Sequence, residues 1–378
     1  MESLEDYRVE IDRIDRELTI LFEKRMDMVL KVANYKKENN VQIFHKNRED
    51  IVFENAKSNL INKDYGDEVV KFFNATMEIG KALQRRKIDD IKKLAEVKVE
   101  RSAIDKSRRI GFPGVSGSFT EEAATKFFGD KIEKSYYEDF EDIFKALEKD
   151  EIYYGIIPIE NSSTGAISQN YDLLKKYGFY IVGEEYLKIQ QHLVGLKDTN
   201  LDKIKEVYSH PQGIEQSSEF LKKYENWKLI PFHNTSTSAK LIKDLSDNTK
   251  VAIASSRAAS IYGLEIIEEC INNQKDNNTR FIVISKELKV VKDADKVSVV
   301  FSLENEAGTL YRLLRYFAEN NINMIKIESR PTKDTPWKYF LYVDFEGDID
   351  SEEVLNALKL IEKNSGYFKL LGAYKKKI

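Results

Sequence analysis

The sequence contains a single cysteine, Cys270, and four scattered histidines. One cysteine excludes an internal disulfide, and so small a set gives no spacing of zinc ligands. No apolar run reaches the roughly 18 residues of a membrane-spanning helix, and the N-terminal stretch MESLEDYRVE is too acidic for a signal peptide. We therefore expect a protein of the reducing cytoplasm that uses neither a metal nor another cofactor.

An excess of charge of one sign is also lacking. The 60 basic and 64 acidic residues are mixed along the chain and leave a formal net charge of −4. This balance excludes a basic face for nucleic acid and a polybasic membrane anchor. Apolar residues, in contrast, are plentiful: 42% of the chain is hydrophobic, with 20 Phe and 20 Tyr, which predicts globular folding throughout. The length of 378 residues favours two or three domains.

The N-terminal part shows the alternating three and four spacing of apolar residues that predicts long helices with a packed seam. The seam of the first helix consists of Leu4, Tyr7, Ile11, Ile14, Leu18, Leu21, Met28, Val32 and Tyr35. Arg25 takes a seam position, where a guanidinium is costly unless paired, so either the helix turns outward there or an anion binds. Lys36 follows on nearly the same face. Further helices are expected from about Asn47 and Asp67, and Gln84 takes a core position in the last of them.

Residues 109–286 alternate short apolar runs with helical periodicity, which is typical of α/β domains. Polar residues follow the runs in the stretches GFPGVSGSF, PIENSSTG, YSHPQ, NTSTSA and NNTRF. Each stretch alone is explained as well by an ordinary helix N-cap, but their number favours an oxygen-rich anion bound at strand ends. Thr279 stands between a polar loop and the apolar run 281–284, so we expect its hydroxyl at the mouth of a strand.

The segment after Lys286 predicts the order strand, helix, strand, strand, helix, strand, which is the ferredoxin-like arrangement. Its strands alternate apolar and polar residues, as expected for a sheet with one helix-covered face. Residues 95–108 lie in a highly charged stretch without Gly or Pro, which we interpret as a linker.

The N-terminal segment resembles the all-helical chorismate mutases, in which three helices per chain of an intertwined dimer surround chorismate. The resemblance implies a catalytic set of Arg8 from a partner subunit, Arg25, Lys36, Arg48, Glu49 and Gln84. Such a site needs no nucleophile, because cations and hydrogen-bonding groups hold the reactive conformer and stabilise charge on the breaking C–O bond. The chain departs from the family at His45 and Gly80. A helical module that only dimerises is the alternative.

The five stretches of residues 109–286 resemble, in order, those of prephenate dehydratases. The resemblance implies two α/β lobes, as in periplasmic-type binding proteins, with the site between them. It also implies that Thr279 donates a proton or hydrogen bond to the leaving hydroxyl of prephenate. A threonine is too weak an acid to do this by pKa matching, so we expect a relay or an orienting role. The implied substrate-binding residues are Glu160, Asn161, Ser162, Ser209, His210, Gln212, Thr235, Ser236, Thr237 and Arg280.

The C-terminal segment resembles ACT regulatory domains that bind phenylalanine. The implied effector-binding residues are Asn305, Ala307, Gly308, Leu310, Glu328, Ser329 and Arg330. Family members often have Pro and Ala where this chain has Ala307 and Thr309, so weaker binding or another amino acid is compatible with the sequence. A folded cap that only dimerises is the alternative.

The whole chain is thus identified as a member of the bifunctional chorismate mutase and prephenate dehydratase family. The expected parts are a helical mutase domain (1–94), a linker (95–108), a dehydratase domain (109–286) and an ACT domain (295–378). The resemblance implies conversion of chorismate to prephenate and then to phenylpyruvate, with feedback inhibition by L-phenylalanine. An arogenate dehydratase and a non-catalytic sensor of a dianion and an amino acid stay open as alternatives. We expect a homo-oligomer, dimer or tetramer, without nucleic-acid or membrane partners.

Overall fold

The computed structural model of the chain describes residues 3–38, 46–88, 101, 103–303, 308–331 and 339–377. The chain divides into two compact units, Met1–Val97 and Lys98–Ile378. Among the residues that the structure describes, no helix is long and apolar enough to cross a membrane.

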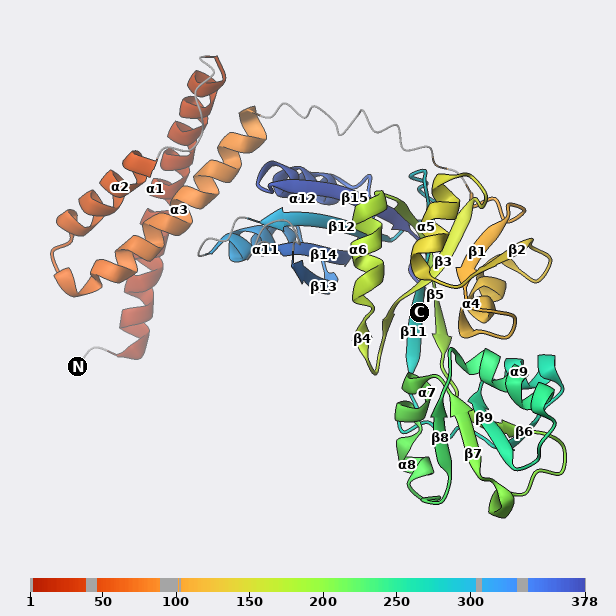
Figure 1. Ribbon diagram of the computed structural model, residues 1–378. Coiled ribbons are helices and arrows are strands. Elements are labelled where there is room, and N and C mark those ends of the chain that lie inside the picture. Colours follow the sequence, from red (N-terminus) through yellow and green to blue (C-terminus); the bar gives the residue numbers. More distant parts are fainter. Residues whose placement is uncertain are drawn as a thin grey trace. The chain divides into compact units, whose positions relative to one another are not determined.

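The first unit is all-helical, as the apolar spacing predicts. Its elements are α1 (Leu4–Glu38), α2 (Lys46–Asn59), the short 3-10 helix η1 (Lys63–Tyr65) and α3 (Gly66–Ile88) (Figure 1). Both α1 and α2 pack against α3. The seam residues near the start of α1, in contrast, are 43–67% exposed: Leu4, Tyr7, Ile11, Ile14, Leu18 and Leu21. Within the described part of this chain, that stretch of seam has no packing partner.

The second unit contains two α/β lobes, and the sheet of the first has the order β2-β1-β3-β11-β5 with β4 paired to β3 (Figure 1). The strands are β1 (Ile110–Pro113), β2 (Lys134–Tyr137), β3 (Tyr154–Asn161), β4 (Gly165–Ala166), β5 (Tyr180–Lys188) and β11 (Asn278–Ser285). The helices are α4 (Phe119–Phe128), α5 (Phe140–Glu148) and α6 (Ser168–Tyr177). The late strand β11 runs antiparallel between β3 and β5, and this register sets Thr279 opposite Asn161.

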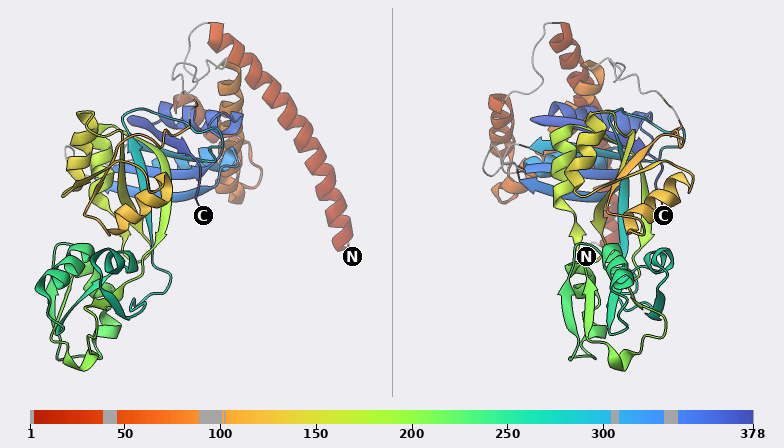
Figure 2. Two further views of the ribbon diagram at one scale, coloured as in Figure 1. Left: turned by 90° about the vertical axis from the view of Figure 1, so that its right-hand side faces the viewer. Right: turned by 45° about the vertical axis from the view of Figure 1, so that its right-hand side comes forward.

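The second lobe is a five-stranded sheet of order β10-β6-β9-β7-β8. Its elements are β6 (His192–Gly195), the 3-10 helix η2 (Leu201–Lys203), β7 (Glu206–Ser209), α7 (Pro211–Gln216), α8 (Ser218–Leu221), β8 (Lys228–Pro231), α9 (Thr235–Leu245), β9 (Lys250–Ala254), α10 (Ser256–Tyr262) and β10 (Glu265–Glu268). The chain enters this lobe after β5 and returns just before β11 (Figure 2). Thr279 therefore lies directly beyond a crossing between the lobes.

The C-terminal domain is an antiparallel sheet of order β13-β14-β12-β15, which is the ferredoxin-like order. It is built from β12 (Lys296–Leu303), α11 (Thr309–Glu319), β13 (Met324–Pro331), β14 (Tyr339–Glu346), α12 (Glu352–Lys363) and β15 (Tyr367–Tyr374). The predicted element order is confirmed. The face away from the helices is also covered, because its residues Val300, Tyr342 and Leu371 join the core of the first lobe.

The two faces of the first-lobe sheet are covered by different elements. One face packs on α4 and includes Phe281 and Val283, while the other packs on α5, α6 and the C-terminal sheet and includes Ile282 and Ile284. Successive strand residues point to opposite faces. Thr279 therefore shares the side of Phe281, and its neighbour Arg280 faces the C-terminal domain.

Candidate functional site

Thr279 lies at the start of β11 and is 7% exposed. Its Oγ1 accepts a hydrogen bond of 2.8 Å from Nδ2 of Asn161, whose amide also donates to Oδ1 of Asn277 at 2.7 Å. Among the described residues, the Thr279 hydroxyl has no acceptor for its own proton. Asn161 thus fixes the oxygen of Thr279 and leaves the O–H group available to a bound molecule.

The loop after β3 is organised around the same asparagine. Its Oδ1 accepts hydrogen bonds from the backbone N–H groups of Ser163 and Thr164, at 2.9 and 3.1 Å. Ser162 ties the loop to the segment before Thr279, since its Oγ accepts from the Asn278 N–H at 2.9 Å. From the second lobe, Nε2 of Gln212 donates to Oγ1 of Thr164 at 3.1 Å. The predicted residues Asn161, Ser162, Gln212 and Thr279 therefore come together where the lobes meet.

Ser209 and Ser236 are fully buried and serve the fold through their hydroxyl groups. Ser209 donates to the carbonyl of Ile253 at 3.0 Å, and Ser236 donates across the lobes to the carbonyl of Ser116 at 2.6 Å. Their position near strand ends agrees with the sequence analysis. Their hydroxyl protons, however, are already held by backbone carbonyls.

His210, Thr235 and Thr237 lie at the starts of the two helices in the second lobe that face the site. Nδ1 of His210 caps α7 by accepting from the Gln212 N–H at 3.2 Å, and burial lowers the pKa of this imidazole. Thr237 forms a reciprocal capping box with Asn234 at the start of α9. Thr235 is the half-buried first residue of that helix. The ordinary N-cap role considered for these loops is thus observed at both helices.

The lobes also touch at the glycine-rich loop before α4. The carbonyls of Ser116 and Gly117 accept hydrogen bonds from Tyr262 at 3.0 Å and from Ser255 at 3.3 Å. A Cβ added to Gly117 would lie 2.8 Å from the Ser236 oxygen, and the residue has a φ of 85°. Glycine is therefore required here for the loop to approach the second lobe.

Ser118 and Glu121 form a modified capping box at the start of α4. Ser118 accepts from the Glu121 N–H at 3.3 Å, but the Glu121 carboxylate accepts from the N–H of Gly117, at 2.7 Å, rather than from that of Ser118. Burial favours the neutral acid, yet the Gly117 N–H, Lys134 and Arg257 together hold the pKa of Glu121 below its usual value. The loop is thus braced by a buried carboxylate.

Glu160 and Arg280 lie on the opposite face of the sheet from Asn161 and Thr279, which differs from the substrate contact expected of them. Arg280 is 3% exposed and pairs with Glu184 at 2.7 Å and with Asp344 of the C-terminal domain at 2.5 Å. Its contact with Glu160 measures 3.0 Å. The expectation overlooked strand alternation: neighbours in sequence serve different faces.

In the helical unit, the predicted residues Arg25 of α1 and Gln84 of α3 lie on helices that pack against each other. Arg25 is half-buried and donates to the carbonyl of Thr76 at 3.3 Å, and burial lowers its pKa. Gly80 adjoins this guanidinium, since an added Cβ would lie 3.7 Å from it. On the same helix as Gly80, Gln84 is 9% exposed, and its buried Oε1 has no hydrogen-bond partner in the described part of the chain. A buried amide oxygen without a partner indicates a place for a ligand or water.

Of the other predicted mutase residues, the structure describes the side chains of Lys36 and Arg8 only. Burial lowers the pKa of Lys36, which lies near the end of α1. Arg8 is exposed and pairs with Glu5 at 3.4 Å. Arg48 and Glu49 belong to α2, but their side chains lie outside the described residues, as does His45.

The predicted effector residues fall at two places in the C-terminal domain. Gly308 precedes α11 with a φ of 80°, and Leu310 in that helix is 43% exposed. Glu328, Ser329 and Arg330 lie on β13, where Arg330 pairs with Asp172 of α6 at 3.1 Å. Asn305 and Ala307 lie outside the described residues.

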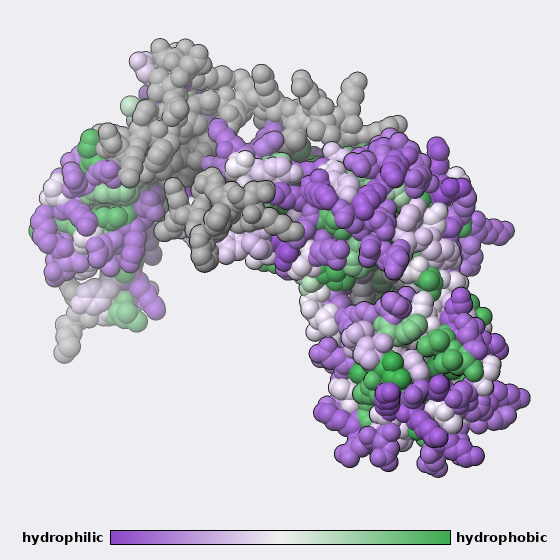
Figure 3. Space-filling model, in the orientation of Figure 1, coloured by the Kyte–Doolittle hydropathy of each residue, from purple (hydrophilic) through white to green (hydrophobic). Residues whose placement is uncertain are grey.

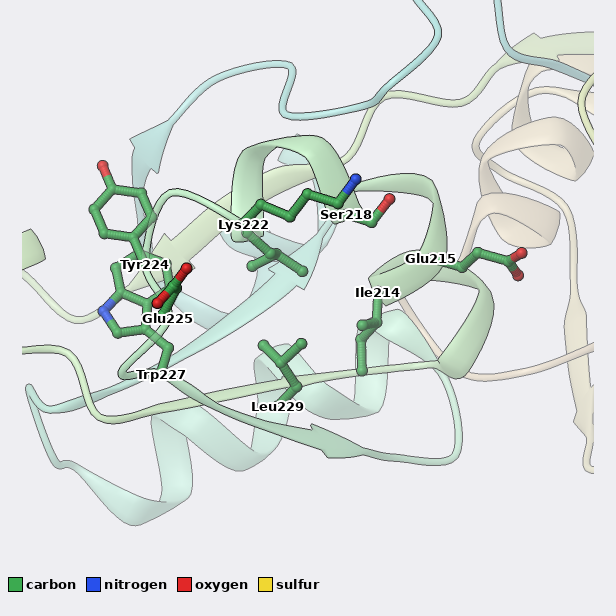
Figure 4. A pocket seen from close by; sticks show the side chains of 9 residues that line it. Ile214, Glu215, Ser218, Lys222, Tyr224, Glu225, Trp227 and Leu229 are labelled. Carbon is green, nitrogen blue, oxygen red and sulfur yellow. The ribbon is translucent and has the colours of Figure 1, made fainter.

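A hollow of about 250 Å³ lies beside α7, α8 and β8 of the second lobe (Figure 4). It is bounded by the stacked rings of Tyr224 and Trp227, whose centroids are 4.0 Å apart, with Ile214 and Leu229. Apolar surface gathers on this lobe in the space-filling view (Figure 3). The hollow contains none of the predicted catalytic residues, so we assign the site by its hydrogen bonds instead.

Three functional candidates were missed in the sequence. Asn277 precedes Thr279 by two residues, so alternation around the NNTRF stretch could have indicated it. Glu184 and Asp344 look like ordinary charges on polar faces of strands. No local signal distinguishes them, because each acquires its role from a partner distant in sequence.

A helical unit with a cation in its seam, a two-lobed α/β region with hydroxyl and amide groups between the lobes, and a ferredoxin-like domain define a multidomain enzyme for small anions with a regulatory module. Family models agree with this class. Chorismate mutase type II matches residues 7–85, prephenate dehydratase matches 110–289 and the ACT domain matches 297–361.

Relatives with this combination are bifunctional chorismate mutase/prephenate dehydratases. The protein of that name from Buchnera aphidicola (Acyrthosiphon pisum strain) is 31% identical and covers 98% of this chain and 96% of its own. That from Aquifex aeolicus is also 31% identical, with coverage of 100% and 99%. A solved prephenate dehydratase of Arthrobacter aurescens in complex with L-Phe matches 71% of this chain and 90% of its own, with 27% identity and a TM-score of 0.65. The chain belongs to the bifunctional chorismate mutase/prephenate dehydratase family.

Proposed function

We propose that the chain converts chorismate to prephenate in its helical unit and prephenate to phenylpyruvate between its α/β lobes. The main support is the hydrogen bond from Asn161 to Thr279, which fixes the Thr279 oxygen where the two lobes meet. Among the described residues, no group accepts the proton of that hydroxyl. Supply of chorismate to the full chain, with detection of phenylpyruvate, tests both steps. Accumulation of prephenate alone would indicate an arogenate dehydratase, and no product at all would indicate a sensor.

In the dehydratase step, prephenate loses its ring carboxylate as carbon dioxide and its ring hydroxyl, and the ring becomes aromatic. The two electrons of the breaking C–CO₂ bond enter the ring as the C–O bond to the hydroxyl breaks. We assign to Thr279 a hydrogen bond to the departing oxygen, with the proton ultimately supplied by water, since a threonine is a weak acid. The hydroxyl needs no reorganisation because Asn161 already holds its oxygen.

Binding of the substrate carboxylates is assigned to the loop after β3 and the starts of the helices in the second lobe. The Gln212 side chain and the backbone near Thr235 supply polar groups there, and helix N-termini favour anions. The Ser162 hydroxyl donates to the Asp276 carbonyl at 3.1 Å, so we assign Ser162 to holding the loop in place. We do not place Glu160 and Arg280 against the substrate, because both engage the C-terminal domain. The proposed dehydratase domain spans residues 109–286, and the proposed ACT domain spans 295–378.

In the mutase step, Arg25, Lys36 and Gln84 are assigned to chorismate. Burial disfavours the charged forms of Arg25 and Lys36. A bound anionic substrate would offset that free-energy cost, which supports a role of both side chains in substrate binding. The exposed seam of α1 supports a homo-oligomer, in which a second copy covers it and contributes Arg8. Arg48 and Glu49 complete the proposed set.

Regulation is assigned to the C-terminal domain, with L-phenylalanine as the proposed effector at Gly308, Leu310 and the β13 residues Glu328 to Arg330. Asn305 and Ala307 belong to the same proposed loop. Isothermal titration with L-phenylalanine tests this assignment, and absence of binding at millimolar ligand would leave only a structural cap.

The free thiol of Cys270, which is exposed, is compatible with the proposed cytoplasmic location.

A further inference from the structure

A set of six charges, four of them buried and two half-buried, joins the first lobe to the C-terminal domain. The first lobe contributes Glu160, Glu184 and Arg280, and the C-terminal domain contributes Lys296, Lys326 and Asp344. Alone, the first half has an excess of one negative charge and the second an excess of one positive charge. Together the charges of the two halves cancel, so each half supplies the opposite charges that the other half needs when it is buried.

The contacts within this set leave its members few alternatives. Arg280 uses three nitrogens on Glu184, Glu160, Asp344 and the hydroxyl of Tyr374, the last at 2.9 Å. Lys296 donates to Glu184 at 2.7 Å. Ser298 donates to the second oxygen of Asp344 at 2.5 Å and lies 2.6 Å from the Tyr374 hydroxyl. Both oxygens of Asp344 are thus engaged, and the guanidinium is held from two domains.

These charges stand directly behind the proposed dehydratase site. Arg280 follows Thr279 on β11, and Glu160 precedes Asn161 on β3, and the two pairs are cross-strand partners in register. Because a strand residue cannot move without its neighbours, a restraint on Arg280 and Glu160 from one face fixes Thr279 and Asn161 on the other. The pairing also shifts register between Arg280 and Phe281, so the ladder alone constrains this end of the strands less.

The strand that carries the proposed effector residues is tied to the same segment. On β13, Lys326 pairs with Glu160 and Arg330 pairs with Asp172 of α6, the helix that follows the Asn161 loop. The charges of Arg280 and Lys326 outweigh burial and hold the pKa of Glu160 below its usual range. A displacement of β13 therefore alters an ionised contact adjacent to Asn161.

We infer that Asp344 and Lys326 of the C-terminal domain are positioning residues of the dehydratase site. By completing the charge set around Arg280 and Glu160, they hold Thr279 and Asn161 in the geometry that the reaction needs, and they transmit effector binding on β13 to that site. The inference rests on the proposed function.

The decisive variant is Asp344→Asn in the full chain, which keeps the shape of the side chain and removes its charge. We expect kcat for prephenate to fall by about tenfold or more, since small displacements of reacting groups are costly, with KM within about twofold and chorismate mutase turnover unchanged. Inhibition by L-phenylalanine should weaken as well. Asp344→Glu, which restores the charge, should recover part of kcat.

Glu346→Gln is the matched control. Glu346 lies two residues further along β14 and pairs with Lys376 at 2.6 Å, outside the cluster. This variant should keep both turnover and inhibition. If Asp344→Asn does not fold, as judged by circular dichroism, the test passes to Lys326→Gln, which occupies a less buried edge of the cluster and should show the same loss of kcat and inhibition.

Folded Asp344→Asn or Lys326→Gln protein with wild-type kcat and wild-type inhibition would overturn the inference. A loss of thermal stability without any change in kcat per folded molecule would also overturn it, because it would show a merely structural role. Failure of the proposed function appears differently: the wild-type chain itself would then form no phenylpyruvate from prephenate.

Discussion

At the scale of single residues, the site depends on hydrogen-bond donors and acceptors that are already assigned before any substrate binds. Both N–H groups of the Asn161 amide are used, one on Asn277 and one on Thr279. Such prior assignment means that the Thr279 oxygen does not have to be oriented during the reaction. The proton of that hydroxyl has no acceptor among the described residues and is therefore available to a ligand.

Replacement of Thr279 by alanine should leave the fold intact and lower dehydratase turnover by about tenfold or more, because the departing oxygen loses its donor. Asn161 keeps its bond to Asn277, so the loop should remain in place. Steady-state kinetics with prephenate measure the effect, and chorismate mutase turnover of the same preparation reports on its integrity. Thr279→Ser retains the hydroxyl and should preserve most of the activity; near-normal turnover of the alanine variant would exclude the assigned role.

At the scale of elements, the sequence indicated the helices and strands well but their surroundings poorly. The apolar spacing predicted a helix through Tyr35, and α1 ends at Glu38. The β-branched and aromatic run 281–284 indicated a strand, but β11 begins earlier, at Asn278, because pairing with β3 and β5 extends it. Local patterns report the residues of an element, whereas its length depends on its neighbours.

The C-terminal sheet shows the same limit more clearly. Lys296, Ser298 and Asp344 lie on the face of this sheet away from its helices, and the sequence analysis singled out none of them. All three are buried, because the first lobe supplies the opposite charges. Two complementary polar faces on separate domains cannot be recognised from the sequence of either one. The roles expected of Glu160 and Arg280 differed from their observed contacts for another reason, which is the alternation of neighbouring strand residues between the two faces.

The exposed seam of α1 gives a prediction at the scale of a helix. Leu18 is 43% exposed within its own chain, and a partner helix that covers the seam would bury it. Leu18→Glu should place a charge in that interface and lower chorismate mutase turnover by about tenfold or more, since burial of an unpaired charge is costly. Separate assays of the two reactions should show dehydratase turnover within about twofold of the wild type.

Arg16→Glu provides the control for this helix, because residue 16 lies on the far side of α1 from residue 18, about 200° away. It should leave mutase turnover near normal. Light scattering of both variants shows whether the loss follows a change in oligomeric state. Unchanged turnover and mass for Leu18→Glu would contradict a partner helix at this seam.

At the scale of the whole molecule, a shared apolar core and a charge set both join the first lobe to the C-terminal domain. Removal of one partner from such a set leaves an uncompensated buried charge, which costs more than loss of a surface pair. Arg280 and Lys296 hold the pKa of Asp344 below its usual value, although burial alone would raise it. The joint between catalytic and regulatory parts should therefore depend on pH in a direction that this shift determines.

A carboxylate with a lowered pKa in the folded protein stabilises the fold above its unfolded pKa, and this contribution is lost as the pH falls through the folded pKa. For Asp344 the loss should begin below about pH 4. Arg280, Lys296, Ser298 and Tyr374, which face it, do not titrate in this range. The carboxylates Glu160 and Glu184, which share Arg280 with Asp344, are present in both the wild type and the Asp344→Asn variant. Wild type should be more stable than Asp344→Asn at pH 7. The difference should shrink as the pH falls below about 4, because protonated aspartate and asparagine are both neutral.

Thermal unfolding of the two proteins between pH 7 and pH 2.5 measures that difference. A gap that stays constant or widens towards low pH would show that Asp344 is not an ionised member of the joint, whereas a closing gap would locate part of the acid sensitivity of the enzyme at the contact between its catalytic and regulatory domains.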